Sequence, residues 1–198
     1  DEEPLVSLRN YIGGRFVEHT GSDWMDVLEP ATGIIYGRVP LSDSATIDAA
    51  VEAACNAQPE WGSLSADERA DWLDKIADYL ESSFEKIAAL ESRDTGKPIS
   101  LARSLDANRS VTNFRFFAGM IREQKTEVFE TDDSTNYVLN KPVGVGALIT
   151  PWNLPLYLLS WKVAPAIGMG NTVVCKPSEL TPMTADLLMR AVDGVGLP

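Results

Sequence analysis

The sequence is poor in the residues that mark disulfide-rich, membrane-spanning and nucleic-acid-binding proteins. Its two cysteines, Cys55 and Cys175, cannot build a disulfide framework, so a reducing cytoplasm is the default location. Its 29 acidic residues outnumber 17 lysines and arginines, which form no basic stripe and argue against nucleic acid or an anionic membrane as partner. The longest apolar stretch, residues 156–168, contains Lys162 and is too short to cross a bilayer. The acidic start, residues 1–4, has the wrong charge for a signal peptide.

The composition that remains is that of a globular protein. The chain has 198 residues, 44% hydrophobic and 23% charged, which fits one ordinary domain or a piece of a larger protein. Hydrophobic periodicity divides it into elements. We expect short strands over 9–40, helices over 44–58, 65–94 and 99–123, a two-strand hairpin of 126–131 with 135–141, strands 143–149 and 172–175, and helices 156–167 and 182–193.

Local signals fix several of these boundaries. The segment from Asn10 to Phe16 contains two glycines between alternating residues and predicts a β-hairpin. Ser65-Ala66-Asp67-Glu68 has the pattern of a capping box, which predicts that the long helix begins at Ser65. The glycine-then-proline sequence Gly96-Lys97-Pro98 predicts its end.

The end of the sequence has the order strand, helix, strand, helix. Small and β-branched residues over 143–149 predict a buried strand of a parallel sheet. Polar residues follow both strands, at the edge where doubly wound sheets bind ligands. Two parallel strands leave a sheet edge unpaired, so we expect an α/β fold that is incomplete in these residues.

Two groups of residues at the carboxyl ends of these strands are candidates for binding. Lys176 and Glu179 follow the second strand, where an acid can accept hydrogen bonds from a nucleotide ribose; a solvated Lys-Glu pair explains them equally well. Asn153 follows the first strand; turn statistics alone favour a simple turn residue, and a carboxamide donor for an oxyanion is the alternative. The glycine pairs Gly144/Gly146 and Gly168/Gly170 fit close packing and a helix end better than a phosphate loop.

Four motifs in register resemble the aldehyde dehydrogenase superfamily, and the resemblance covers essentially the whole chain. They are Pro151-Trp152-Asn153-x-Pro155, Trp161-Lys162-x-x-Pro165-Ala166, Gly170-Asn171-Thr172 and Lys176-Pro177-Ser178-Glu179. The resemblance implies the amino-terminal part of that fold, a Rossmann-like parallel sheet with flanking helices and an oligomerisation hairpin. It divides the chain into cofactor-domain strands and helices (1–125), the hairpin (126–141) and the first part of the NAD-binding sheet (142–198), with the catalytic domain absent.

The resemblance also assigns site residues. Asn153 would be the side-chain half of an oxyanion hole. The cofactor NAD would be bound by Ile149, Thr150, Pro151, Trp152, Lys176, Pro177, Ser178 and Glu179, and it is favoured over NADP because an ionised Glu179 would repel a 2′-phosphate. No metal site is assigned. The hairpin 126–141 would pair subunits into a homo-oligomer, a dimer or a tetramer.

The family's reaction oxidises an aldehyde to a carboxylate through a cysteine thiolate and a general-base glutamate. Neither Cys55 nor Cys175 lies in the family's nucleophile context, and Cys175 falls inside a strand where a buried thiol is inert. In relatives, the nucleophile and the base lie beyond the position of Pro198. The resemblance therefore predicts that residues 1–198 alone are inactive.

The resemblance extends to one branch of the superfamily. Residues 109–118 and 151–159 are similar to the 2-aminomuconic and 2-hydroxymuconic semialdehyde dehydrogenases. In that branch the arginine that matches Arg109 binds the substrate carboxylate, a role that suits a guanidinium fork. Without the resemblance, Arg109 would be a helix-surface arginine. The alternatives are a betaine aldehyde or succinic semialdehyde dehydrogenase, and a non-catalytic fragment that binds nucleotide or pairs with full-length subunits.

Overall fold

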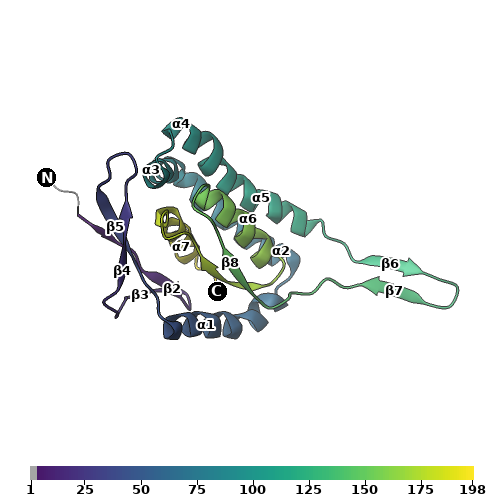
Figure 1. Ribbon diagram of the computed structural model, residues 1–198. Coiled ribbons are helices and arrows are strands. Elements are labelled where there is room, and N and C mark those ends of the chain that lie inside the picture. Colours follow the sequence, from purple (N-terminus) through teal and green to yellow (C-terminus); the bar gives the residue numbers. More distant parts are fainter. Residues whose placement is uncertain (1–3) are drawn as a thin grey trace.

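The computed structural model describes residues 4–198, so the acidic start used against a signal peptide lies largely outside the described residues. The fold is mixed α/β (Figure 1). Its strands are β1 (Val6–Ser7), β2 (Asn10–Ile12), β3 (Arg15–Val17), β4 (Trp24–Leu28), β5 (Ile35–Pro40), β6 (Glu127–Glu130), β7 (Thr135–Val138), β8 (Val145–Ile149) and β9 (Thr172–Lys176). Its helices are α1 (Ser44–Ser63), α2 (Ala66–Ser82), α3 (Phe84–Thr95), α4 (Ile99–Leu101), the π-helix η1 (Ala102–Ala107), α5 (Asn108–Arg122), α6 (Pro155–Gly168) and α7 (Met183–Val195).

The amino-terminal strands form two small sheets, at the left of Figure 1. Strands β1, β5 and β4 make one sheet in that order, and β2 pairs with β3 in the predicted hairpin, with Tyr11 opposite Phe16. The hairpin turn requires glycine, because Gly13 and Gly14 have φ of 59° and 75°. This part of the chain therefore follows the sequence prediction.

The single long helix expected over 65–94 is wrong: the structure has two helices, α2 and α3, that meet at Ser83. The predicted start is confirmed, because Ser65 Oγ accepts from the Glu68 N–H at 3.2 Å and the Ser65 N–H donates to Glu68 Oε2 at 2.8 Å. The break lies at two consecutive serines, Ser82 and Ser83. The Ser82 hydroxyl donates to the Tyr79 carbonyl at 2.7 Å, and serine hydroxyls compete in this way for the backbone groups of a helix.

The helical region expected over 99–123 forms, but it contains a π-helical turn that no sequence pattern indicated. The turn spans Ala102–Ala107 and continues directly into α5. It buries Ala102, Asp106 and Ala107. A wider turn of this kind inserts an extra residue into the helix, and such insertions are common at functional sites.

One hydrophobic core joins the helices. In Figure 1, α2, α5 and α6 lie side by side, and their facing side chains are fully buried. The largest of these are Phe114, Leu73, Ile76, Leu80, Ile121, Leu156 and Leu159, and Leu188 of α7 is buried in the same core. Among the helices of residues 4–198, none combines the length and the apolar character needed to cross a membrane.

Strands β8 and β9 pair in parallel, and α6 makes the connection between them. The register places Val145 opposite Thr172 and Ile149 opposite Lys176, as a βαβ unit requires. The prediction that the first strand is buried is wrong, since β8 alternates between half-buried and exposed residues and Ile149 is 65% exposed. The described sheet has only these two strands, so each strand has one unpaired edge.

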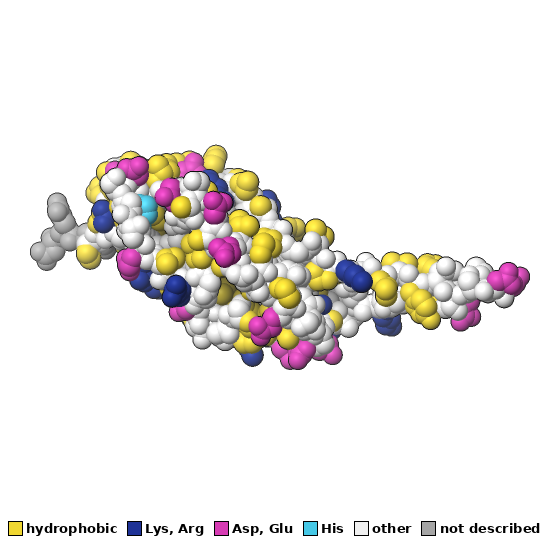
Figure 2. All heavy atoms as spheres, turned by 90° about the horizontal axis from the view of Figure 1, so that it is seen from below, with side chains coloured by type: hydrophobic (Ala, Val, Ile, Leu, Met, Phe, Trp, Pro, Cys, Tyr) yellow, Lys and Arg dark blue, Asp and Glu magenta, His cyan; other side chains and the backbone are white. Residues whose placement is uncertain are grey.

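The predicted hairpin of β6 and β7 projects away from the helices (Figure 1). All eight residues of its two strands are exposed. Hydrophobic side chains lie along it (Figure 2), and the largest are Val128, Phe129, Tyr137, Val138 and Leu139. A two-strand hairpin with exposed apolar side chains has little stability of its own.

Candidate functional site

The carboxyl ends of β8 and β9 lie next to each other and carry the predicted cofactor residues. The Thr150 N–H donates to the Lys176 carbonyl at 3.2 Å, which joins the two strand ends. Thr150 is buried, whereas Ile149, Pro151 and Trp152 are exposed. Backbone pairing therefore brings both predicted binding segments, 149–152 and 176–179, to the carboxyl end of the sheet.

Asn153 lies in the turn between β8 and α6, and its side chain is exposed. Its carboxamide makes no hydrogen bond to any of residues 4–198, so both N–H groups are available to a ligand. Its backbone carbonyl, in contrast, accepts from Lys97 Nζ at 3.4 Å. Asn153 thus combines a held backbone with a free donor side chain, as an oxyanion-binding residue requires.

Lys176 and Glu179 form the ion pair that the sequence allowed. Lys176 Nζ donates to Glu179 Oε2 at 2.7 Å, and the two side chains are 62% and 41% exposed. The hydrogen bond from Lys176 lowers the pKa of Glu179, so its carboxyl group is ionised at neutral pH. Pro177 and buried Ser178 connect them, and Ser178 Oγ accepts from the Leu180 N–H at 3.2 Å. An exposed pair contributes little to stability, so this pair remains accessible for binding.

Arg109 is exposed on the first turn of α5 and forms no ion pair within residues 4–198. Asn113, one helical turn later on the same face, donates to the Tyr157 carbonyl at 3.2 Å and to Ser160 Oγ at 2.9 Å. These bonds tie that face of α5 to α6, the helix that begins two residues after Asn153. Arg109 is therefore a free cation on the helix face that meets α6.

The two cysteines are unsuited to nucleophilic chemistry. Cys175 lies opposite Leu148 in the sheet and packs against the core, where burial raises the pKa of its thiol to about 12. A thiol with so high a pKa carries almost no thiolate at neutral pH. Cys55 is exposed on α1, outside the turn that carries Asn153.

Sequence reasoning missed a group of buried charges beneath the Asn153 turn. Glu91 and Asp94 lie one turn apart on α3, Lys97 follows the helix, and Asp106 lies in η1. Lys97 Nζ is 2.8 Å from Asp106 Oδ2 and 4.0 Å from Glu91 Oε2. Burial raises the pKa of Glu91 to about 7 and that of Asp94 to about 6.

The two α3 carboxyl groups serve as caps for other helices. The residues that precede α6 and α7, Leu154 and Pro182, provide no capping side chain. Glu91 Oε1 accepts from the Leu156 N–H at 2.9 Å, at the start of α6. Asp94 Oδ2 accepts from the Met183 N–H at 2.9 Å, at the start of α7. Carboxylates near helix N-termini satisfy free N–H groups and interact favourably with the helix dipole.

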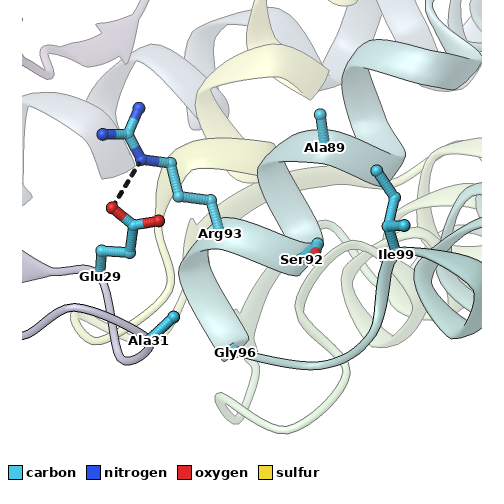
Figure 3. Close-up of a pocket in the computed structure, with 7 residues that line it drawn as sticks. All are labelled: Glu29, Ala31, Ala89, Ser92, Arg93, Gly96 and Ile99. Atoms are coloured by element: carbon cyan, nitrogen blue, oxygen red, sulfur yellow. Dashed lines mark ion pairs between the residues drawn. The ribbon is translucent and has the colours of Figure 1, made fainter.

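A separate hollow of about 500 Å³ lies between α3 and the turn after β4 (Figure 3). Glu29 and Arg93 form an ion pair on one side of it, with Arg93 Nε 3.4 Å from Glu29 Oε2. Its remaining lining residues are Ala31, Ala89, Ser92, Gly96 and Ile99. None of the predicted cofactor or substrate residues lines this hollow.

The sequence and the fold of this chain both have known relatives. Residues 16–198 match the sequence profile described as the aldehyde dehydrogenase family. The chain is 49% identical over 196 residues to 2-aminomuconic semialdehyde dehydrogenase of Bos taurus, covering 98% of this chain and 40% of that protein. It is 42% identical over 200 residues to 2-hydroxymuconic semialdehyde dehydrogenase of Pseudomonas sp. (strain CF600), covering 98% and 41% respectively.

Solved structures give the same result for the fold. Lactaldehyde dehydrogenase from Escherichia coli superposes with a TM-score of 0.94 at 36% identity, covering 99% of this chain and 41% of that one. PnpE in complex with nicotinamide adenine dinucleotide superposes with a TM-score of 0.92 at 42% identity, covering 96% and 39%. The chain thus spans about 40% of the length of the relatives it matches. The predicted α/β fold is confirmed as that of the amino-terminal part of such structures.

Proposed function

This chain belongs to the aldehyde dehydrogenase family, and on that premise we propose that the whole protein oxidises a carboxylate-bearing semialdehyde to the acid with NAD. The substrate we propose is 2-aminomuconic or 2-hydroxymuconic semialdehyde, the compounds in the names of the relatives described above. The observation that carries the proposal is the free Asn153 carboxamide, held at the same sheet edge as the Lys176–Glu179 pair.

Asn153 has the chemistry that the proposed reaction needs. When a thiolate adds to an aldehyde carbonyl, the oxygen gains negative charge, and a fixed donor that meets this charge lowers the barrier. NAD, which Lys176 and Glu179 would hold, would supply the hydride acceptor that oxidation of an aldehyde requires. Residues 4–198 supply the hydrogen-bond donor. Cys55 and Cys175 do not suit the role of nucleophile, and this proposal assigns that role to a cysteine elsewhere in the whole protein.

The residues at the carboxyl ends of β8 and β9 support NAD as the cofactor. The Lys176 ammonium can donate to a ribose hydroxyl and the Glu179 carboxylate can accept from one. Because the pKa of Glu179 is lowered, its negative charge would oppose the 2′-phosphate of NADP. Exposed Ile149 and Trp152 offer apolar surface beside this pair. Glu179→Gln should therefore narrow the preference for NAD over NADP, as measured by kcat/KM for each cofactor.

Arg109 supports a substrate with a carboxylate. Its guanidinium is exposed and unpaired within residues 4–198, so it can bind a carboxylate in a bidentate way without first breaking an internal ion pair. Arg115, on the same helix, is instead held by Asp78 at 2.6 Å and Glu81 at 2.8 Å. Only the first of these two arginines is free for substrate.

The hairpin of β6 and β7 supports a homo-oligomer. We propose that 126–141 pairs with a second subunit, because this hairpin projects from the body of the fold (Figure 1). Its apolar side chains Phe129, Tyr137 and Leu139 are 54%, 62% and 66% exposed. Such a row of apolar side chains and open strand edges is a typical site for pairing.

The test uses the protein expressed from its complete native coding sequence. NADH formation is measured with 2-hydroxymuconic semialdehyde, succinic semialdehyde and betaine aldehyde, for the wild type, Arg109→Ala and the control Arg115→Ala. We expect Arg109→Ala to lose activity with the aldehydes that carry a carboxylate and to keep it with betaine aldehyde. A uniform loss across all three would contradict the carboxylate role, and a wild type without activity would contradict the proposed function.

A further inference from the structure

We propose that Lys97, held between Glu91 and Asp106, is a positioning residue that fixes the Trp152–Leu156 turn and so directs the Asn153 carboxamide toward the oxyanion; this inference rests on the proposed function. Lys97 does not itself reach the substrate in this proposal. It acts on the backbone of the residue that does.

The turn depends on side chains from elsewhere in the chain. Thr181 Oγ1 donates to the Trp152 carbonyl at 3.4 Å, and Lys97 Nζ donates to the Asn153 carbonyl at 3.4 Å. Glu91 Oε1 accepts from the Leu156 N–H at 2.9 Å and from Thr184 Oγ1 at 2.8 Å. Three backbone groups of the turn, at Trp152, Asn153 and Leu156, are thus held by residues from α3, from the segment after it, and from the segment before α7.

Lys97 connects the turn to a rigid base. Its side chain is 11% exposed, whereas those of Glu91 and Asp106 are fully buried. Asp106 lies in the π-helical turn directly before α5 and is buried there. A lysine fixed by a buried carboxylate at 2.8 Å has lost the rotamer freedom that a surface lysine keeps.

The charges in the cluster explain why a lysine is needed. Glu91 Oε2 and Asp106 Oδ1 are buried and make no hydrogen bond within residues 4–198. The Lys97 ammonium lies 2.8 Å from Asp106 Oδ2 and 4.0 Å from Glu91 Oε2, and its positive charge attracts both carboxyl groups. Removing it would leave two neighbouring buried acids without a cation, and they would separate or take up protons. Either response moves Glu91, and with it the start of α6 at Leu156.

A small movement here would affect catalysis strongly. The Asn153 side chain extends from the peptide that Lys97 holds, so a shift of that peptide carries the carboxamide with it. A displacement of about 1 Å can cost ~10²-fold in rate. Loss of an oxyanion donor altogether costs ~10²–10³-fold.

The experiment is a double-mutant cycle in the protein expressed from its complete native coding sequence. Lys97→Met, Asn153→Ala and the double variant are compared for kcat, KM and the Kd of NAD. The control is Arg103→Gln. Arg103 lies in the same π-helical turn as Asp106, and the substitution breaks its exposed ion pair with Glu85 of α3. We expect Lys97→Met to lower kcat by ~10-fold or more with NAD affinity unchanged, and to cause no further loss in the Asn153→Ala background. Losses that multiply, or an unchanged kcat in Lys97→Met, would overturn the proposal.

A second measurement separates this inference from the proposed function. Hydrogen exchange of the Asn153, Leu154 and Leu156 amides should be faster in Lys97→Met than in the wild type, and unchanged in Arg103→Gln. If the wild-type protein oxidises no aldehyde, the proposed function fails, and unchanged exchange in Lys97→Met would overturn the positioning role as well. If Lys97→Met does not fold, Lys97→Met/Asp106→Asn removes one charge of each sign and serves in its place; unchanged exchange there has the same meaning.

Discussion

Replacing Glu91 with glutamine should make the free energy of unfolding less dependent on pH. The Glu91 side chain is fully buried, and burial raises its pKa from 4.5 to about 7. Between these values the folded protein binds more protons at this group than the unfolded chain does. The free energy of unfolding therefore falls as the pH rises through this window, and the loss is complete above about pH 7.

The size of the effect follows from the same two values. The interval from 4.5 to about 7, at ~1.36 kcal/mol per pH unit, corresponds to about 3 kcal/mol. Glutamine keeps an oxygen that can accept from the Leu156 N–H and Thr184, but its amide faces the Lys97 ammonium. That new contact involves no group that titrates at this position. It therefore changes the free energy of unfolding of the variant by the same amount at every pH and leaves its pH dependence unaffected.

Urea unfolding of the wild type and Glu91→Gln at pH 5, 6, 7 and 8 measures the slope. The wild type should lose about 2.5 kcal/mol more than the variant between pH 5 and pH 8, because the part of the effect below pH 5 lies outside this range. Asp94, whose raised pKa of about 6 acts in the same direction, remains in both proteins and cancels in the comparison. Glu85→Gln, an exposed carboxyl group on the same helix, is the control. Equal slopes for wild type and Glu91→Gln would refute the reasoning.

Three further predictions follow from local contacts. Ser65→Ala removes the side-chain half of the capping box and should lower the free energy of unfolding by about 1 kcal/mol, read from the thermal midpoint. Gly168→Ala places a methyl group against Ile121 in the packed core and should cost about 1–3 kcal/mol in urea unfolding; no loss would contradict the close packing of α5 and α6. Iodoacetamide should modify exposed Cys55 well before Cys175, whose pKa is raised to about 12, as intact-mass kinetics would show.

The family and most of the fold could be predicted from the sequence. The four motifs that suggested an aldehyde dehydrogenase are confirmed by the family match, and the hairpins and the βαβ unit lie where the patterns placed them. The two errors were of a kind that local patterns cannot exclude. The apolar stripe continued past Ser83 without a glycine or proline to mark the break, and the residues of β8 are those of a buried strand although β8 is half-exposed here.

The buried charges could have been noticed. The apolar stripe of the second predicted helix, Leu80, Phe84 and Ile87, continues with helical spacing to Glu91 and Asp94. Charged residues in core positions of a helix are rare unless they are paired, so their place in the stripe was a signal. Their partners could not be inferred, because Leu156 and Met183 are far away in the chain and offer backbone N–H groups, which no sequence pattern displays.

The caps that α3 supplies have a consequence for the order in which the chain folds. Glu91 binds Leu156 across 65 positions, and Asp94 binds Met183 across 89. The ribosome synthesises α3 well before it synthesises α6 and α7. Until those helices dock, Glu91 and Asp94 have no helix N-terminus to cap in the partly folded intermediate. In that intermediate they are open to water and carry their ordinary charge. Docking of α6 and α7 then buries them, so this docking step takes up protons near neutral pH and is favoured by mildly acidic conditions.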